Sequence, residues 1–174
     1  MSTPKKLTLY IKSAYPFLKD MLKITESDTE FVDIYVTTLL PGRFALAVCD
    51  LIRMIKVPTR IFVFLPMDIS ALAILSCATA EKYILGHTFL DFQYSIYPEF
   101  SPENDIFSFA YQDPDDLIHR FASIIAENTG KPLEDILSLT EKESVLSAEE
   151  IVEHGFADGI ITDLEMLDLP LKST

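Results

Sequence analysis

The spacing of hydrophobic positions alternates along the chain between a period of two or a continuous run and a helical period. Alternating or continuous apolar runs predict strands at 7–12, 31–37, 60–65 and 89–94. Helical spacing predicts helices at 14–24, 44–55 and 70–83. The helix 44–55 is apolar nearly all round, so we expect it to be deeply buried. This order predicts an α/β fold with parallel strand pairing and right-handed crossovers.

Helix start and stop signals organise the C-terminal third. Asp113-Pro114 opens a helix that Gly130 ends, because Pro suits the first helical turn and Gly follows helix C-termini. Pro132 opens a second, short helix. Ser147 and Glu150 have capping-box spacing, and Gly155 closes the helix that they start. The C-terminal third is therefore predicted to contain three helices.

Length and composition predict a single domain spanning residues 1–174, with 49% hydrophobic residues and a formal net charge of −13. An acidic surface repels phosphate backbones and anionic lipid, so we expect neither nucleic acid nor membrane as a partner. With no signal peptide, and with Cys49 and Cys77 in apolar helical patterns, we expect a cytoplasmic protein with reduced thiols. No metal-ligand spacing or Gly-rich phosphate loop is present, so no cofactor or metal is expected.

Eight aromatic residues gather between Phe89 and Tyr111. One interpretation is core strands and a packed loop; the other is a subunit interface, where aromatic residues are enriched. The eight are Phe89, Phe92, Tyr94, Tyr97, Phe100, Phe107, Phe109 and Tyr111.

Residues 129–158 resemble the C-terminal segment of the Clp protease proteolytic subunit (ClpP) family: a Thr-Gly, a short helix, a Thr-Glu pair, then a Ser-Ala-Glu-Glu helix. The residues after Pro41-Gly42 are similar to the family's helix after its Gly-Gly turn. The resemblance covers about residues 7–163. It implies a ClpP/crotonase-like superhelix of β-β-α units with a parallel sheet and C-terminal helices.

The resemblance also places the family's catalytic groups. Ser70 falls at the nucleophile position, Gln93 at the position of the His base, and Leu139 at that of the orienting Asp. A serine needs an adjacent base, and an amide cannot accept its proton near neutral pH. Gly42 and Arg43 occupy the oxyanion-hole position, where the family has two glycines. Asp68 stands where the family has a small residue, and either Asp68 or Ser70 could cap the helix that follows.

The resulting hypothesis is a ClpP-like serine peptidase homologue that is catalytically inactive. As the resemblance implies, it would be an oligomeric subunit in a ring of six or seven copies, or would join an active ClpP-like subunit, with a Clp ATPase as a further partner. One alternative is a weak serine hydrolase that uses Ser70 with a displaced base such as His87. Another is a crotonase-like acyl-CoA-binding protein or a scaffold. His119 and His154 lie on amphipathic helices, where packing or solvent-facing roles are expected.

Overall fold

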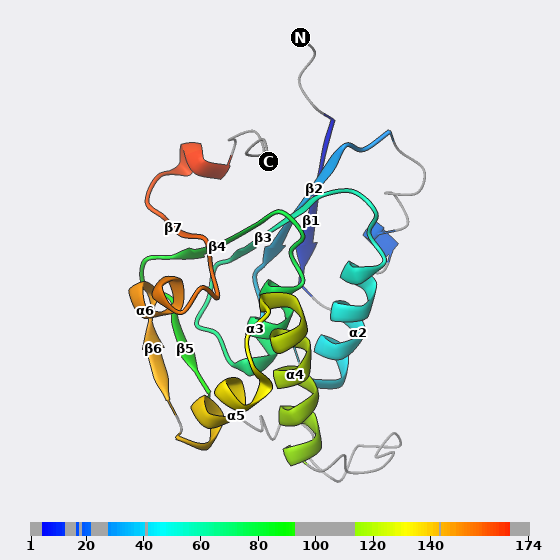
Figure 1. The fold of residues 1–174 in the computed structure, drawn as a ribbon. Coiled ribbons are helices and arrows are strands. Elements are labelled where there is room, and N and C mark those ends of the chain that lie inside the picture. The colour runs from blue at the N-terminus through cyan, green and yellow to red at the C-terminus, as the bar shows by residue number, and fades with distance from the viewer. Residues whose placement is uncertain are drawn as a thin grey trace, which may run out of the picture.

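A central parallel sheet organises the computed structural model, which describes residues 5–12, 17, 19–21, 28–40, 42–92, 114–142 and 144–167 (Figure 1). Within these residues the strand order is β1-β2-β3-β4-β7, and each neighbouring pair is parallel. The expected α/β class with a mainly parallel sheet is confirmed. The strands are β1 (Lys6–Ile11), β2 (Phe31–Val36), β3 (Thr59–Val63), β4 (Glu81–Leu85) and β7 (Gly159–Ile161).

Three helices cover one face of the sheet: α2 (Gly42–Arg53), α3 (Ile69–Ser76) and α4 (Pro114–Thr129). Helix α3 packs against both α2 and α4, and Figure 1 shows the three helices on the same side of the sheet. All eight residues of α3 are buried. Helix α2 was expected to be deeply buried as well. That prediction was wrong, because only one face of α2 meets the core and Phe44 is 48% exposed.

The helix expected over 70–83 is shorter in the structure. It ends at Ser76, Cys77 caps it, and residues 81–85 form β4 instead. Tyr83 and Ile84 suit a strand, and the open position beside β3 lets them pair there. The apolar run 70–83 could not be divided by periodicity alone, because a buried helix and a buried strand both read as continuous hydrophobic sequence.

A smaller unit extends beside the sheet. Strand β5 (Phe89–Asp91) pairs in antiparallel fashion with β6 (Val145–Ser147), next to α5 (Leu133–Glu141) and α6 (Ala148–Glu153). The capping box of Ser147 and Glu150 is present, and Gly155 follows α6 with φ +70°, as predicted. The short 3-10 helix η1 (Leu164–Leu167) lies near the C-terminal end of the described chain.

Some expectations fall outside the described residues. The helix 14–24 is described only at residues 17 and 19–21, which are helical. Of the aromatic cluster, Phe89 is 43% exposed and Phe92 is buried. Six further aromatic residues of that cluster and Gln93 lie in 93–113, outside the described part of the chain.

The two faces of the sheet have different chemistry. The face toward the helices is aliphatic, whereas the opposite face carries a stacked row of aromatic rings from Tyr10 through Tyr35 and Phe62 to Tyr83. Beside that row, Arg60 donates to both oxygens of the Asp33 carboxylate, at 2.7 and 2.8 Å. The central strands β2 and β3 are therefore buried on both faces, whereas Tyr10 at the edge is 47% exposed, and the second face includes a buried ion pair.

Candidate active site

Helices α2 and α3, which carry Gly42 and Ser70, begin at the same edge of the sheet. Strands β2 and β3 are adjacent and parallel, and they lead into α2 and α3 respectively. Ligand and catalytic sites of parallel sheets lie at this carboxyl edge. Gly42 is the first residue of α2 and is buried, and the following Arg43 is exposed. The structure thus places Gly42 and Ser70 at neighbouring helix starts.

The turn before Ser70 is tied to the strand that leads toward Gln93. The amide of Met67 donates to the carbonyl of Phe89 at 2.8 Å, and the amide of Asp91 donates to the carbonyl of Met67 at 2.9 Å. Met67 and Leu90 form a parallel bridge. Strand β5 therefore runs directly beside the start of α3.

The same strand connects to Leu139. The amide of Phe92 donates to the carbonyl of Ser144 at 3.0 Å, and the amide of Ser144 donates to the carbonyl of Leu139 at 3.1 Å. Backbone hydrogen bonds thus link the α3 turn, the end of β5 and the end of α5. Ser70, the strand before Gln93, and Leu139 belong to three segments that this network joins.

The Ser70 hydroxyl is held by a carboxylate. Ser70 is 1% exposed, and its Oγ donates to Asp68 Oδ1 at 2.6 Å. The same Asp68 oxygen accepts from the amide of Ala71 at 2.9 Å, so Asp68, and not Ser70, is the N-cap of α3. Sequence reasoning did not foresee the bond between the two side chains, although an Asp two residues before a Ser at a helix start is a local signal for it.

His87, the alternative base, lies at the turn between β4 and β5 and is exposed. The described part of the chain contains no hydrogen bond between His87 and Ser70. His119 is exposed on α4, and His154 is exposed and stacks on Phe156 with ring centroids 5.7 Å apart. Neither is in hydrogen-bonding contact with Ser70 among the described residues.

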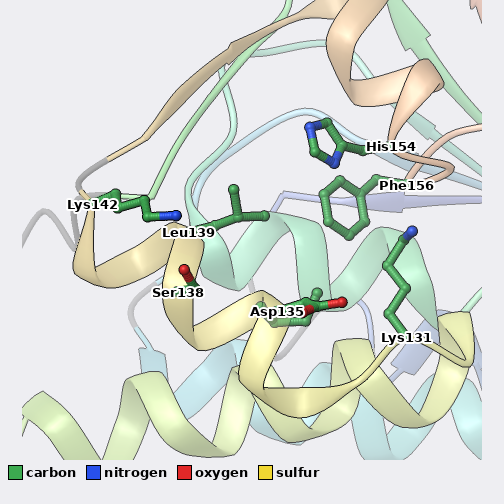
Figure 2. Close-up of a pocket in the computed structure, with 8 residues that line it drawn as sticks. Lys131, Asp135, Ser138, Leu139, Lys142, His154 and Phe156 are labelled. Carbon is green, nitrogen blue, oxygen red and sulfur yellow. The ribbon is translucent and has the colours of Figure 1, made fainter.

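Leu139 lines an open pocket of about 270 Å³ between α5 and the end of α6. Figure 2 shows its side chain projecting toward the Phe156 ring, with His154 on one side of that ring and Lys131 on the other. The Lys131 ammonium lies 5.5 Å from the ring centroid. The remaining lining residues are Asp135, Ile136, Ser138 and Lys142. Leu139 is therefore half-buried beside an aromatic ring, and sequence reasoning did not foresee the Lys131 and Lys142 side chains around it.

Loss of the N-cap should cost more than loss of the hydroxyl. We expect Asp68→Ala to lower the free energy of unfolding by about 1–3 kcal/mol, since it removes the cap and leaves the buried Ser70 hydroxyl without its acceptor. Ser70→Ala removes one hydrogen bond and should cost about 0.5–1.5 kcal/mol. Urea denaturation of both variants measures which of them loses more unfolding free energy. A larger cost for Ser70→Ala would contradict the assignment of Asp68 as the cap.

Introducing the family's acid at residue 139 should be mildly destabilising. Leu139→Asp is expected to cost about 1–2 kcal/mol, because half of a leucine's burial is lost and a carboxylate enters a partly apolar contact. Thermal and urea denaturation measure this cost. Leu139→Ala is the control that removes packing without adding charge. A melt unchanged by both substitutions would mean that Leu139 makes no stabilising contact with Phe156.

Within the described ranges, no helix is both long and apolar enough to cross a bilayer. No group of three or more His, Cys, Asp or Glu side chains among the described residues is arranged to hold a metal ion.

Comparison with known proteins gives three consistent findings. Residues 12–163 match the family model described as Clp protease. A 45-residue segment is 42% identical to the ATP-dependent Clp protease proteolytic subunit 1 of Bacillus cereus; it covers 26% of this chain and 23% of that protein. The ClpP protease catalytic domain from Plasmodium falciparum has a similar fold, with a TM-score of 0.67 and 18% identity over 95% of this chain and 86% of that one.

Proposed function

This chain belongs to the Clp protease family, and from that premise we propose that it is a non-catalytic, oligomeric ClpP-like subunit. The observation that carries the proposal is the hydrogen bond from Ser70 Oγ to Asp68 at 2.6 Å. A serine nucleophile needs an adjacent base whose pKa lies near the working pH. Ser70 instead donates to a carboxylate, and the imidazole base that activates the serine of a Ser-His-Asp triad is not its partner.

The position of Asp68 also argues against an oxyanion site. Its carboxylate sits at the N-terminus of α3, where the family's nucleophile helix begins, and it already accepts the Ala71 amide. A negative charge there would oppose the charge that develops on a substrate carbonyl oxygen. With Leu139 in place of the orienting acid and Gln93 in place of the base, three departures from the family pattern all reduce catalysis.

A serine-reactive fluorophosphonate probe and short fluorogenic peptides test the chemistry. We expect the purified protein neither to react with the probe nor to cleave the peptides, and Ser70→Ala to behave as the wild type does. Labelling that disappears in Ser70→Ala would overturn the proposal and favour the hydrolase alternative. Repeating the experiment with Asp68→Asn and His87→Ala would then identify the base, because only loss of the true base would abolish labelling.

Assembly is the second part of the proposal. Several large apolar side chains are exposed on the described chain, and an oligomer would cover such surface. The family forms rings, so we propose a homo-oligomer of six or seven subunits, as one ring or two stacked rings, or a mixed ring with an active ClpP-like subunit. The exposed side chains are Tyr10, Phe44, Met54, Phe89, Val145 and Leu164.

Native mass spectrometry and light scattering at micromolar concentration measure the assembly. We expect a mass of six or seven times 19.7 kDa, or twice that. A clean 19.7 kDa monomer would overturn the homo-oligomer. Co-expression with an active family member and tagged purification tests the mixed ring. Failure to co-purify, together with a monomeric mass, would remove the assembly proposal while leaving the catalytic one standing.

A further inference from the structure

The pocket between α5 and the end of α6 combines apolar and cationic side chains. Its volume is about 270 Å³, close to the lower limit for pockets that hold small molecules. Leu139 is the half-buried apolar side chain of its wall. Ile136 and Phe156 line the same pocket and are themselves fully buried. The volume therefore suits a ligand with one apolar group, of about the size of a leucine side chain.

Two lysines border the pocket without an acidic partner. Lys142 is exposed, and the Lys131 ammonium lies 5.5 Å from the Phe156 ring centroid. Neither lysine forms an ion pair with another described residue, although the chain has a formal net charge of −13. Their charges are therefore available to an anionic ligand, which the acidic surface elsewhere would repel. The cationic side chains that do form ion pairs include Lys5, Lys6, Arg53, Arg60 and Arg120.

A hydroxyl group lies one helical turn from Lys142. Ser138 and Lys142 are four residues apart at the end of α5, and the amide of Lys142 donates to the carbonyl of Ser138 at 3.3 Å. Side chains with this spacing are neighbours on a helix surface. Figure 2 shows the Ser138 hydroxyl and the Lys142 ammonium on the same side of Leu139. A carboxylate accepts hydrogen bonds from both kinds of donor, and the bond from an ammonium is charge-assisted.

One acidic side chain limits where a negative charge fits. Asp135, in the first turn of α5, is exposed and lines the same pocket. The carbonyl groups at the end of α5 also disfavour an anion, and the Lys142 ammonium offsets them. Seven residues, or about two helical turns, separate Asp135 from Lys142. The pocket therefore favours one negative charge at the Lys142 end, and not a second one beside Asp135.

We propose that this pocket binds a small carboxylate that carries one apolar group. The carboxylate accepts hydrogen bonds from the Ser138 hydroxyl and the Lys142 ammonium, and the apolar group packs on Leu139. Lys131 adds attraction from a greater distance. Two sources supply this chemistry: a free organic acid, and the carboxyl end of a peptide whose last residue is apolar. Binding of either one needs no peptidase chemistry.

Saturation-transfer difference NMR on the purified full-length protein tests the proposal, because it detects weak ligands on proteins of any assembly size. The probes are isocaproate as the free acid and N-acetyl-leucine as the peptide end, each compared with its amide. We expect at least one of the two carboxylates to bind. Its amide should bind about tenfold more weakly, because it lacks the charge that strengthens the hydrogen bonds. Raising the salt concentration should weaken carboxylate binding.

Substitutions in the pocket should change the affinity in opposite directions. Lys142→Gln should weaken carboxylate binding about tenfold, since it removes the charge-assisted hydrogen bond, and Ser138→Ala should weaken it less. Asp135→Asn should strengthen binding severalfold, because it removes the opposing charge. Lys56→Gln is the matched control: Lys56 is exposed after α2 and does not line the pocket, so the affinity should be unchanged. The melting temperature of each variant shows whether it is folded.

Several results would overturn the proposal. Failure of both carboxylates to bind would do so, as would equal binding of a carboxylate and its amide. An equal loss of affinity in Lys142→Gln and Lys56→Gln would show that only the overall charge of the protein matters. Binding of one carboxylate and not the other supports the site and identifies its source. None of these outcomes depends on peptidase activity or on the state of assembly.

Discussion

Replacement of Arg60 by methionine is expected to lower the free energy of unfolding by about 3–5 kcal/mol, the range for removing one partner of a buried ion pair. Asp33 is fully buried, and Arg60 gives it two hydrogen bonds, at 2.7 and 2.8 Å. Burial would lower the pKa of Arg60, but hydrogen bonds from the guanidinium to Asp33 and the charge of that carboxylate raise it, so Arg60 stays charged. Without Arg60, Asp33 keeps Lys6, at 3.4 Å, as a partner.

The guanidinium also packs between rings, which adds to the expected loss. Its central carbon lies 5.3 Å from the Phe31 ring centroid and 5.4 Å from that of Phe62. Methionine keeps part of this packing and removes the charge. Most of the loss of unfolding free energy in Arg60→Met should therefore come from the lost charge. The Arg60 side chain also lies 3.8 Å from Glu81.

Urea denaturation of Arg60→Met measures the change in the free energy of unfolding. Two control variants show which interaction causes it. Arg120→Met breaks an exposed pair with Asp116 and should cost less than about 1 kcal/mol. The double variant Asp33→Leu with Arg60→Met should recover much of the loss, because it removes both charges together. A double variant as unstable as Arg60→Met would show that packing, and not the loss of Arg60 as the partner of the Asp33 carboxylate, sets the cost.

Phe156→Ala is expected to lower the free energy of unfolding by about 3–5 kcal/mol, the usual cost of deleting a buried phenylalanine ring. Phe156 is fully buried, meets Phe92 edge-on with centroids 6.4 Å apart, and stacks with His154. It holds β5, α5 and the end of α6 together, so its loss should loosen the segment that carries Leu139. Equilibrium unfolding in urea measures the change.

The volume of the side chain at residue 156 should determine how much unfolding free energy is lost. Phe156→Leu keeps most of the volume and should cost less than about 1.5 kcal/mol. Met54→Ala truncates an apolar side chain that is 67% exposed and should fall within about 0.5 kcal/mol of the wild type. If Phe156→Ala lowered the free energy of unfolding no more than Met54→Ala does, the Phe156 ring would not contribute to the stability of the core.

Local signals in the sequence predicted much of the fold correctly. The capping box at Ser147 and Glu150, and the glycines at 130 and 155, depend only on residues within one or two turns, and the structure has them where the spacing indicated. The apolar run at 60–65 likewise predicted a strand, and β3 lies there with all five of its residues buried. Such features are encoded within a few residues, so neighbouring sequence suffices to determine them.

Predictions were wrong where the decision depended on distant segments. Strand β4 was taken as the end of a helix, because its place beside β3 is set by pairing that no local pattern reveals. Helix α2 was taken as deeply buried, although only one of its faces meets the core. Short β6 and β7 were not predicted, since three residues carry too little periodicity to be recognised.

The sequence by itself predicted an α/β protein that resembles a peptidase family, and it led us to expect Ser70 at the nucleophile position and Leu139 at the position of the acid. Only the tertiary structure decided what surrounds them: the 2.6 Å bond from Ser70 to Asp68, and the pocket in which Leu139 faces Phe156. It also decided that Arg60 meets Asp33 across two strands, and that Cys49 and Cys77 come from two helices that pack against each other. The physical reason is that element type follows from local spacing, whereas the partner of a buried charge or thiol is set by strand register and helix packing over distances that a linear sequence does not display.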